Sequence, residues 1–172
     1  MVKSGIKISA EVKQLHSQFK TKQSNEKKVA AFILKFSDDS KSVVPINESI
    51  LYDDCATPYS TTVQSFPKDS CRFALVDIKY KDTEGKYPNK IALITWAPED
   101  AGRGRILVPS TLDALKSELE GSLVHVQMCD EDDKDITNVL ERVASKAVVR
   151  FEEEDVYFDA SGKYVKGKAP GQ

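Results

Sequence analysis

Three apolar segments of strand length constrain the fold of this chain most strongly. Residues 29–36 form an apolar run, and residues 71–80 and 90–96 carry apolar side chains on both faces of an alternating pattern. Runs of this kind are typical of strands that are covered on both sides. The sequence therefore predicts a sheet whose central strands lie between two layers.

The other periodic segments are helices and shorter strands. Val12, Leu15 and Phe19 recur at helical spacing behind Ser9, which suits an N-cap. We predict helices over residues 9–21, 58–66, 110–120 and 133–146, and further strands over residues 42–46 and 123–128. This order predicts one α/β domain with a mixed five-stranded sheet and helices on both faces.

A cationic segment precedes the third predicted helix. The strand 90–96 is followed by a loop with Arg103 and Arg105, and then by Pro109, a residue favoured at the first position of a helix. Gly121 is suited to end that helix. Nothing in the segment is arranged for bond-making chemistry. The segment predicts a rigid helix that is preceded by cationic residues and is suited to binding another protein.

The composition excludes several classes of protein. Among 172 residues, 25 are basic and 27 acidic, which gives a net charge of −2, whereas dedicated nucleic-acid binders carry a basic excess. No apolar run approaches the ~20 residues that span a bilayer, and the first residues lack the apolar centre of a secretory signal. Cys55, Cys71 and Cys129 show neither disulfide nor zinc-site spacing. We expect a reduced, cytosolic protein without metal or cofactor.

Short motifs spread over nearly the whole chain carry a family resemblance. They are Ser4-Gly5-Ile6, Cys71-Arg72-Phe73-Ala74 with Asp77, Ile94-Thr95-Trp96-Ala97-Pro98, Arg105-Ile106-Leu107, Asp113-Ala114-Leu115 and Val139-Leu140-Glu141-Arg142-Val143. In residues and spacing, the chain resembles the actin-depolymerising factor/cofilin family over residues 4–146. The resemblance implies the ADF-homology (gelsolin-like) fold, which agrees with the pattern described above.

The resemblance implies an actin-binding protein that is not an enzyme. Members of the family bind actin monomers and filament sides, sever filaments and promote depolymerisation. It also implies a monomeric protein of the cytoplasm and the actin cytoskeleton, with the nucleus as a further location. The alternative is a module of the same fold that only sequesters monomers or only decorates filaments.

The resemblance assigns contact residues to two sets. Contacts with both monomers and filaments fall on Ser4, Gly5, Ile6, Arg103, Arg105, Ile106, Leu112 and Lys116. Contacts with filaments alone fall on Lys86, Lys90, Glu141, Arg142 and Lys146. Ser4 is also the family's position for regulatory phosphorylation, and a phosphate there is expected to be repelled by acidic actin.

The same residues have plain structural interpretations. Arg103 and Arg105 fit a solvated basic loop, although the guanidinium fork also matches carboxylates on actin. Ile106, which replaces the family's usual methionine, and Leu112 fit either the core or an apolar contact. Lys146 fits a dipole partner at the end of the last helix.

The helix after the two arginines is less basic than is usual in the family. Leu112 and Glu118 stand where lysine is common, and Lys116 keeps a basic residue. Attraction to an anionic membrane is worth about 1 kcal/mol per nearby basic residue. We therefore expect phosphoinositides to bind only weakly.

Residues 147–172 lie outside the resemblance and are expected to form a C-terminal extension after the domain of residues 1–146. An acidic run at residues 152–155 precedes two apolar pieces, and Ser161 and Gly162 suit the turn of a small hairpin. The last residues are expected to be disordered. Our hypothesis is that the acidic run masks the basic end of the last helix and weakens filament binding.

Overall fold

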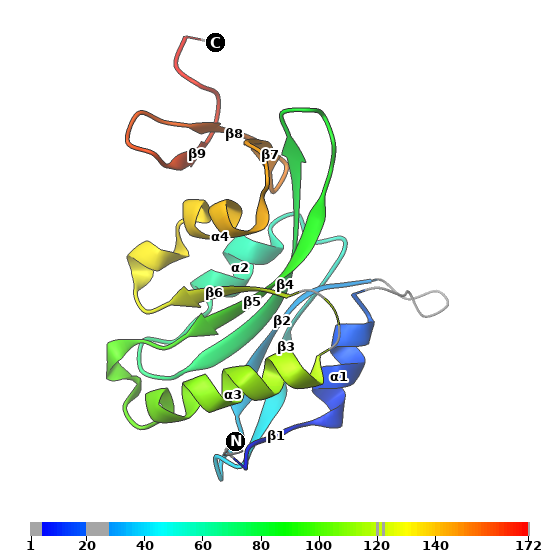
Figure 1. The fold of residues 1–172 in the computed structure, drawn as a ribbon, viewed down its shortest axis with the longest axis vertical. Coiled ribbons are helices and arrows are strands. Elements are labelled where there is room, and N and C mark those ends of the chain that lie inside the picture. The colour runs from blue at the N-terminus through cyan, green and yellow to red at the C-terminus, as the bar shows by residue number, and fades with distance from the viewer. Residues whose placement is uncertain (1–4, 20–27, 120, 122, 172) are drawn as a thin grey trace.

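A mixed β-sheet with helices on both faces forms the body of the protein (Figure 1). The computed structural model describes residues 5–19, 28–119, 121 and 123–171. The strands are β1 (Lys7–Ile8), β2 (Val29–Phe36), β3 (Ser42–Tyr52), β4 (Arg72–Asp82), β5 (Asn89–Trp96), β6 (Leu123–Met128), β7 (Val148–Phe151), β8 (Glu154–Phe158) and β9 (Tyr164–Lys166). The helices are α1 (Ala10–Ser17), α2 (Pro58–Gln64), α3 (Gly104–Glu118) and α4 (Ile136–Val143).

The central strands follow the order β3-β2-β4-β5-β6. The pairs β3–β2, β2–β4 and β4–β5 are antiparallel, and β5–β6 is parallel. The apolar runs of β2, β4 and β5 lie in the interior of this order, where both faces are covered. The predicted α/β fold with a mixed sheet is therefore confirmed.

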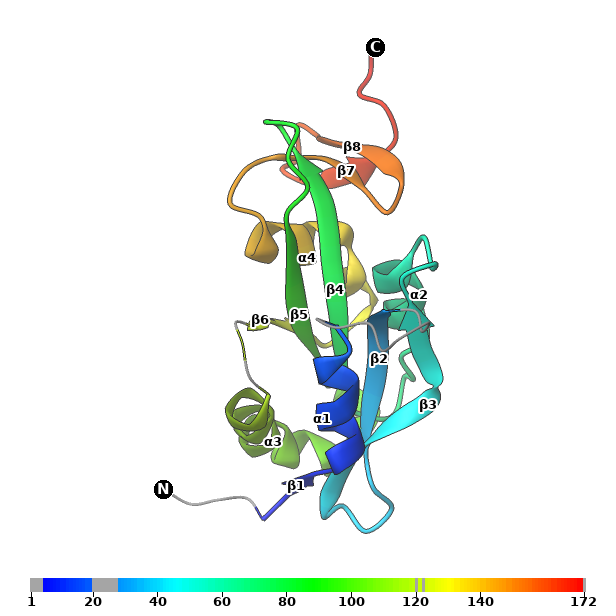
Figure 2. The ribbon, with the colours of Figure 1, turned by 90° about the vertical axis from the view of Figure 1, so that its right-hand side faces the viewer.

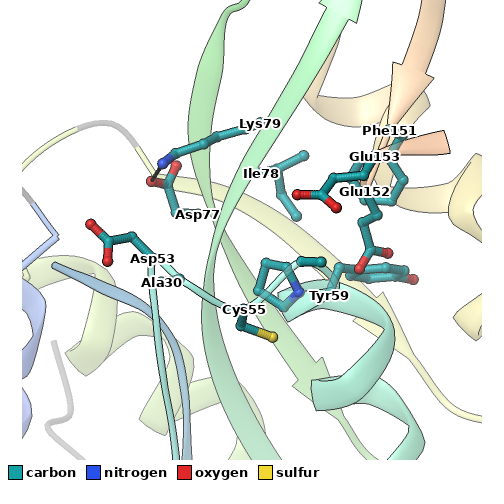
Figure 3. Close-up of a pocket in the computed structure, with 12 residues that line it drawn as sticks. Ala30, Asp53, Cys55, Tyr59, Asp77, Ile78, Lys79, Phe151, Glu152 and Glu153 are labelled. Atoms are coloured by element: carbon teal, nitrogen blue, oxygen red, sulfur yellow. Dashed lines mark ion pairs between the residues drawn. The ribbon is translucent and has the colours of Figure 1, made fainter. Parts of the chain in front are cut away.

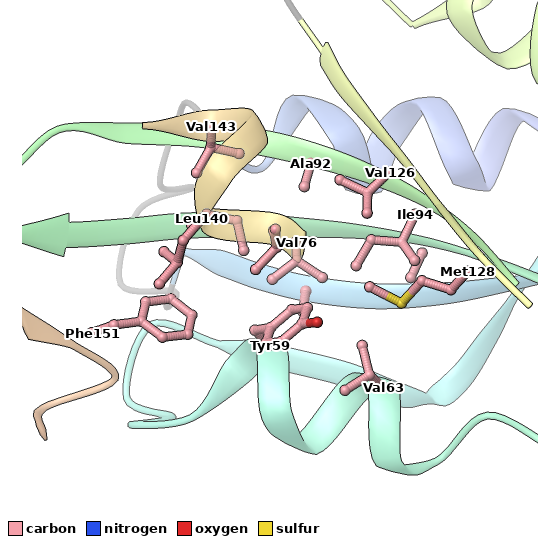
Figure 4. Close-up of a cluster of buried hydrophobic side chains, with 14 of the residues drawn as sticks. Tyr59, Val63, Val76, Ala92, Ile94, Val126, Met128, Leu140, Val143 and Phe151 are labelled. Atoms are coloured by element: carbon pink, nitrogen blue, oxygen red, sulfur yellow. The ribbon is translucent and has the colours of Figure 1, made fainter. Parts of the chain in front are cut away.

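Two apolar cores lie on opposite faces of the sheet. Because successive side chains of a strand point to opposite faces, Ala31 and Ile33 join the core under α2 and α4, whereas Phe32 and Leu34 join the core under α1 and α3. Figure 4 shows the first core, to which α2 and α4 contribute Tyr59, Val63, Leu140 and Val143. The site-bearing helices α3 and α4 thus lie on opposite faces.

The sheet has more strands than the five predicted, because further strands pair with the edge strand β3 and with the outer part of β4. β1 pairs parallel with β3, and β7 pairs antiparallel with β4 at Tyr80–Asp82, beyond the part of β4 that β2 covers. Figure 2 shows β4 and β5 rising past the rest of the sheet to meet β7 and β8. A long strand leaves an unpaired edge, and the C-terminal segment fills it.

The predicted start of α3 is wrong. The helix begins at Gly104 rather than at residue 110, so Pro109 lies inside it. Proline cannot donate to the carbonyl four residues earlier, which is that of Arg105. The Ser110 and Thr111 hydroxyls donate to a different carbonyl oxygen, that of Leu107, at 3.2 and 2.6 Å. The early start also carries Val108 into the second core, where it is buried.

The last helix, α4, is shorter than predicted. Residues 131–134 form a separate 3₁₀ turn, and the Asp135 side chain caps α4 by accepting from the Thr137 backbone N–H at 2.8 Å. The helix ends at Val143, so Lys146 lies beyond it and is not its dipole partner.

No helix within the described residues is long and apolar enough to span a membrane.

Candidate functional site

The start of α3 gathers the predicted cationic and apolar contacts on one exposed turn. Arg103 precedes the helix, and Arg105 and Ile106 lie in its first turn rather than in a loop. Both arginines are exposed, and Ile106 is 78% exposed, so Ile106 is not a core residue. Leu112 is partly buried against the second core. We call Arg103, Arg105, Ile106 and Leu112 the α3 cluster.

A shallow hollow runs along the α3 cluster. It encloses about 320 Å³ and is lined by Ala97, Arg105, Ile106, Val108, Pro109, Leu112 and Gln127. Leu112 packs on the core, as one of its two interpretations predicts, and it also lines the hollow, while its contact with actin stays a prediction. Neither arginine has an ion pair among the described residues, so both guanidinium groups remain available to a partner's carboxylates.

The chain segment before α3 holds this turn in place. Gly102 has φ 63°, a conformation that glycine adopts without strain, and the Arg105 backbone N–H donates to its carbonyl at 3.2 Å. Gly104 packs against Cys71, and a Cβ added to Gly104 would lie 3.4 Å from the Cys71 sulfur. Burial raises the pKa of the Cys71 thiol, which favours a packing role over a nucleophilic one.

The N-terminal segment lies beside α3. Ile6 is partly buried and packs against the same core as Leu112, and the exposed Gly5 precedes it with φ 75°. Lys13 of α1 forms an ion pair with Glu118 of α3 at 2.8 Å, while Lys116 is exposed on α3. Ser4, the predicted phosphorylation site, lies outside the described residues. The described part of the first predicted set therefore gathers on one end of the molecule.

The second predicted set is only partly assembled. Lys86, in the β4–β5 turn, and Lys146, between α4 and β7, form ion pairs with the same carboxylate, that of Glu84. We call Glu84, Lys86 and Lys146 the hairpin-tip cluster. It lies at the opposite end of the long axis from α3 (Figure 1). Glu84 is a residue that the sequence did not single out.

The remaining residues of the second set lie apart from that carboxylate. Glu141 and Arg142 are exposed on α4, on the side away from its buried apolar face. Lys90 is exposed on β5 opposite Ile78 and lines a different hollow of the surface, together with Asn89. The second predicted set therefore extends over several elements instead of forming one compact site.

His125 of β6 lies within reach of charges from both helices. It is partly buried and shares a hydrogen bond of 3.0 Å with the Thr95 hydroxyl. Burial is the largest cause that lowers the pKa of His125, and the positive charges of Lys116 and Arg142 lower this pKa further. These neighbours could not be predicted from the sequence around His125, because they come from α3 and α4.

A separate hollow beneath the C-terminal strands is lined by carboxylates (Figure 3). Asp77 forms an ion pair with Lys79 at 3.9 Å and accepts from Asn89 at 3.0 Å. Glu152 accepts from the Ser60 hydroxyl at 2.5 Å. Within the described residues, no group of three or more potential ligands is placed to hold a metal ion. The hollow shares no residue with the two clusters.

The acidic run is engaged inside the extension and with α2. Glu152 is buried, has φ 51°, and binds Ser60 at the start of α2, while Glu154 and Asp155 pair with Lys166 and Arg150. None of the ion pairs described joins the run to Arg142 or Lys146. The structure thus gives the extension a docking contact on α2, and the carboxylate that pairs with Lys146 comes from Glu84.

A comparison with protein families identifies the class of the chain. The model of cofilin/tropomyosin-type actin-binding proteins matches residues 5–144. The chain belongs to this family, and the resemblance seen in the sequence is confirmed. The family binds actin. Residues 145–172 lie outside the match.

Known relatives agree with this assignment. The chain is 28% identical over 142 residues to a cofilin of Mycosarcoma maydis, covering 82% of this chain and 96% of that protein. It is 28% identical over 149 residues to a cofilin of Yarrowia lipolytica, covering 86% and 92%. The crystal structure of Streptomyces griseoflavus cofilin shares the fold, with a TM-score of 0.67, 21% identity and coverage of 83% of this chain and 100% of that chain.

Proposed function

We propose that the chain binds actin monomers and the sides of actin filaments, severs filaments and promotes their depolymerisation. The observation that carries this proposal is the exposed Ile106, 78% accessible, which directly follows the exposed Arg105 and lies three residues after the exposed Arg103. An aliphatic side chain so exposed on a rigid helix is suited to burial against a partner. The arginines beside it suit a partner rich in carboxylates.

The α3 cluster is the proposed contact with both monomers and filaments. Gly5 and Ile6 extend it on one side, and Lys116 extends it along α3. Ser4 directly precedes Gly5, so a phosphate on Ser4 would add negative charge next to this surface and weaken its hold on actin. Leu112 stands where the family commonly has a lysine, and the charge of Lys13 is engaged by Glu118, so this surface offers fewer unpaired basic groups. We therefore propose that phosphoinositides bind weakly.

The second proposed surface meets the neighbouring subunit of a filament. It consists of the hairpin-tip cluster lysines, Lys86 and Lys146, with Lys90, Glu141 and Arg142. Two separate surfaces on one domain, with the hairpin-tip cluster at the opposite end from α3, suit simultaneous contact with two actin subunits, and such bridging supports severing. We propose that the protein acts as a monomer in the cytoplasm and on the actin cytoskeleton, and also in the nucleus.

A module that sequesters monomers, or decorates filaments without severing them, is the second candidate. The observation that favours it is the pairing of Lys86 and Lys146 with Glu84, which leaves less free positive charge for a filament. A weak second surface would leave the α3 cluster to act alone on monomers. The two candidates therefore differ in the strength of the second surface.

Co-sedimentation with filaments, combined with imaging of single filaments, tests the proposal. The expected result is that the protein pellets with filaments and that filaments fragment where it binds. A protein that binds labelled monomers but stays in the supernatant is a sequestering module. A protein that pellets without fragmentation is a decorating module. Absence of binding to either form of actin contradicts the proposed function.

A further inference from the structure

The turn between β4 and β5 is held in shape by Asp82 and not by Glu84. The buried Asp82 carboxylate accepts from the backbone N–H groups of Glu84 and Lys86 at 2.9 and 3.0 Å. Gly85 supplies φ 79° at the bend. The Asp82 backbone N–H also donates to the Lys86 carbonyl at 3.0 Å. The shape of the turn therefore does not depend on the Glu84 side chain, and its carboxylate can pair with neighbouring cations.

The Glu84 carboxylate forms ion pairs with two lysines. One oxygen lies 3.7 Å from Lys86 Nζ, and the other is in an ion pair with Lys146 Nζ. The side chains of Glu84 and Lys146 are 47% and 45% exposed, and that of Lys86 is 75% exposed. A backbone hydrogen bond of 3.1 Å from Thr83 to the Ala147 carbonyl joins the same two segments. The three charges thus meet on a surface open to a partner.

We propose that Glu84 is an internal counter-ion of the filament-binding surface, whose carboxylate a filament's own acidic groups must displace. The inference rests on the proposed function of Lys86 and Lys146 and adds a residue that governs the strength and salt dependence of that contact. An acidic surface approaching these lysines competes with Glu84 for the same ammonium groups. The competition lowers filament affinity and leaves the distant α3 cluster unaffected.

The physical terms set the direction and size of this effect. Exposed ion pairs are weak, so a partner can exchange them, but each exchange removes part of the gain from the new contact. The pairs are also screened by salt, so the competition fades at high ionic strength. The Asp82 hydrogen bonds and the Thr83–Ala147 bond do not involve the Glu84 side chain, so the turn keeps its shape without that carboxylate.

The Glu84→Gln substitution tests the proposal, since glutamine keeps the size of the side chain and removes its charge. In low-salt co-sedimentation, we expect filament affinity to rise by roughly threefold, the size of change that weak surface pairs support. Affinity for labelled monomers should stay unchanged. The gain should shrink at high salt and disappear when Lys86→Gln and Lys146→Gln are also present.

The Glu48→Gln substitution is the matched control. Glu48 is exposed on β3 and has no ion pair among the described residues, and its replacement changes the net charge by the same amount. An equal gain from Glu48→Gln, or a gain that survives in the lysine-free background, would show a general charge effect and overturn the proposal. Unchanged or weaker binding by Glu84→Gln would overturn it as well.

The outcome also separates this inference from the proposed function. If the unmodified protein pellets with filaments and Glu84→Gln does not bind more tightly, the counter-ion role fails while the filament function stands. If neither protein pellets but both bind monomers, the filament function fails, and the counter-ion role fails with it. If only Glu84→Gln pellets, both the second surface and its internal competitor are supported.

Discussion

The α3 cluster and the hairpin-tip cluster differ in how their charges are balanced. In the α3 cluster, Arg103 and Arg105 precede the exposed Ile106, and neither arginine has an ion pair within the described residues. In the hairpin-tip cluster, Lys86 and Lys146 share the Glu84 carboxylate. In our proposal, the first surface binds through apolar contact and unpaired cations. The second exchanges internal partners before it binds, so we expect it to be the weaker and more salt-sensitive of the two.

The largest effect short of charge reversal is expected from Ile106→Ala. Burying an isoleucine side chain contributes about 2 kcal/mol, so monomer affinity should fall by roughly 30-fold. Because Ile106 is 78% exposed in the free protein, the variant should unfold at nearly the same temperature as the unmodified chain. Titration of fluorescently labelled monomers measures the loss. The Tyr87→Ala variant, which removes a side chain that is 71% exposed near the other cluster, is the control and should leave monomer binding intact.

The next effect is expected from reversing the two lysines of the hairpin-tip cluster. Lys86→Glu with Lys146→Glu should lower filament affinity by roughly tenfold, because like charges then face an acidic filament. Monomer affinity should remain within about twofold, since the α3 cluster lies at the other end of the molecule. Co-sedimentation and monomer titration of one preparation give both values. Parallel losses in the two assays would show that the clusters are not independent.

A smaller effect is expected from Ser4→Glu, which changes the residue that precedes Gly5 in the sequence. One added negative charge should weaken monomer binding by roughly fivefold, less than a phosphate, which carries about −1.5 to −2 charges. Ser4→Ala is the neutral control and should bind as the unmodified chain does. Equal monomer affinity for the two variants would remove Ser4 from the contact surface.

The smallest effect concerns His125, which lies near cations of both α3 and α4. Its pKa lies below 6.5 in the folded chain, chiefly through burial and then through Lys116 and Arg142. Between that lowered pKa and 6.5, the unfolded chain binds a proton that the folded chain does not, so the free energy of unfolding falls as the pH drops through this window. His125→Gln should show a shallower fall, by less than about 1.4 kcal/mol per pH unit. Urea unfolding at several pH values tests this, and identical slopes would contradict it.

The sequence predicted the elements whose signals are local. The runs of β2, β4 and β5 were recognised because strands covered on both faces are apolar on both faces. The prediction misplaced the start of α3 because proline is most common in the first turn of a helix, whereas Pro109 lies inside this one. β7 was missed because its pairing depends on how far β4 extends beyond β2.

The same distinction applies to the candidate site. Arg103, Arg105 and Ile106 are neighbours in the chain, so a single helical turn brings them together and the sequence could group them. Glu84 and Lys146 are 62 residues apart, and only the pairing of β4 with β7 brings them into contact. An ion pair of this kind has no local signature in the sequence. The grouping of residues in the α3 cluster was therefore predictable from the sequence, and the role of Glu84 in the hairpin-tip cluster was not.

The central claim is that the exposed turn at the start of α3 recognises actin through its two arginines. The most direct test is a titration of labelled monomers with the double variant Arg103→Glu, Arg105→Glu, whose fold is checked by its unfolding temperature. Since facing like charges across an interface costs several kcal/mol, affinity should fall by more than about a hundredfold in a folded protein. A folded double variant that binds monomers as tightly as the unmodified chain would contradict the account.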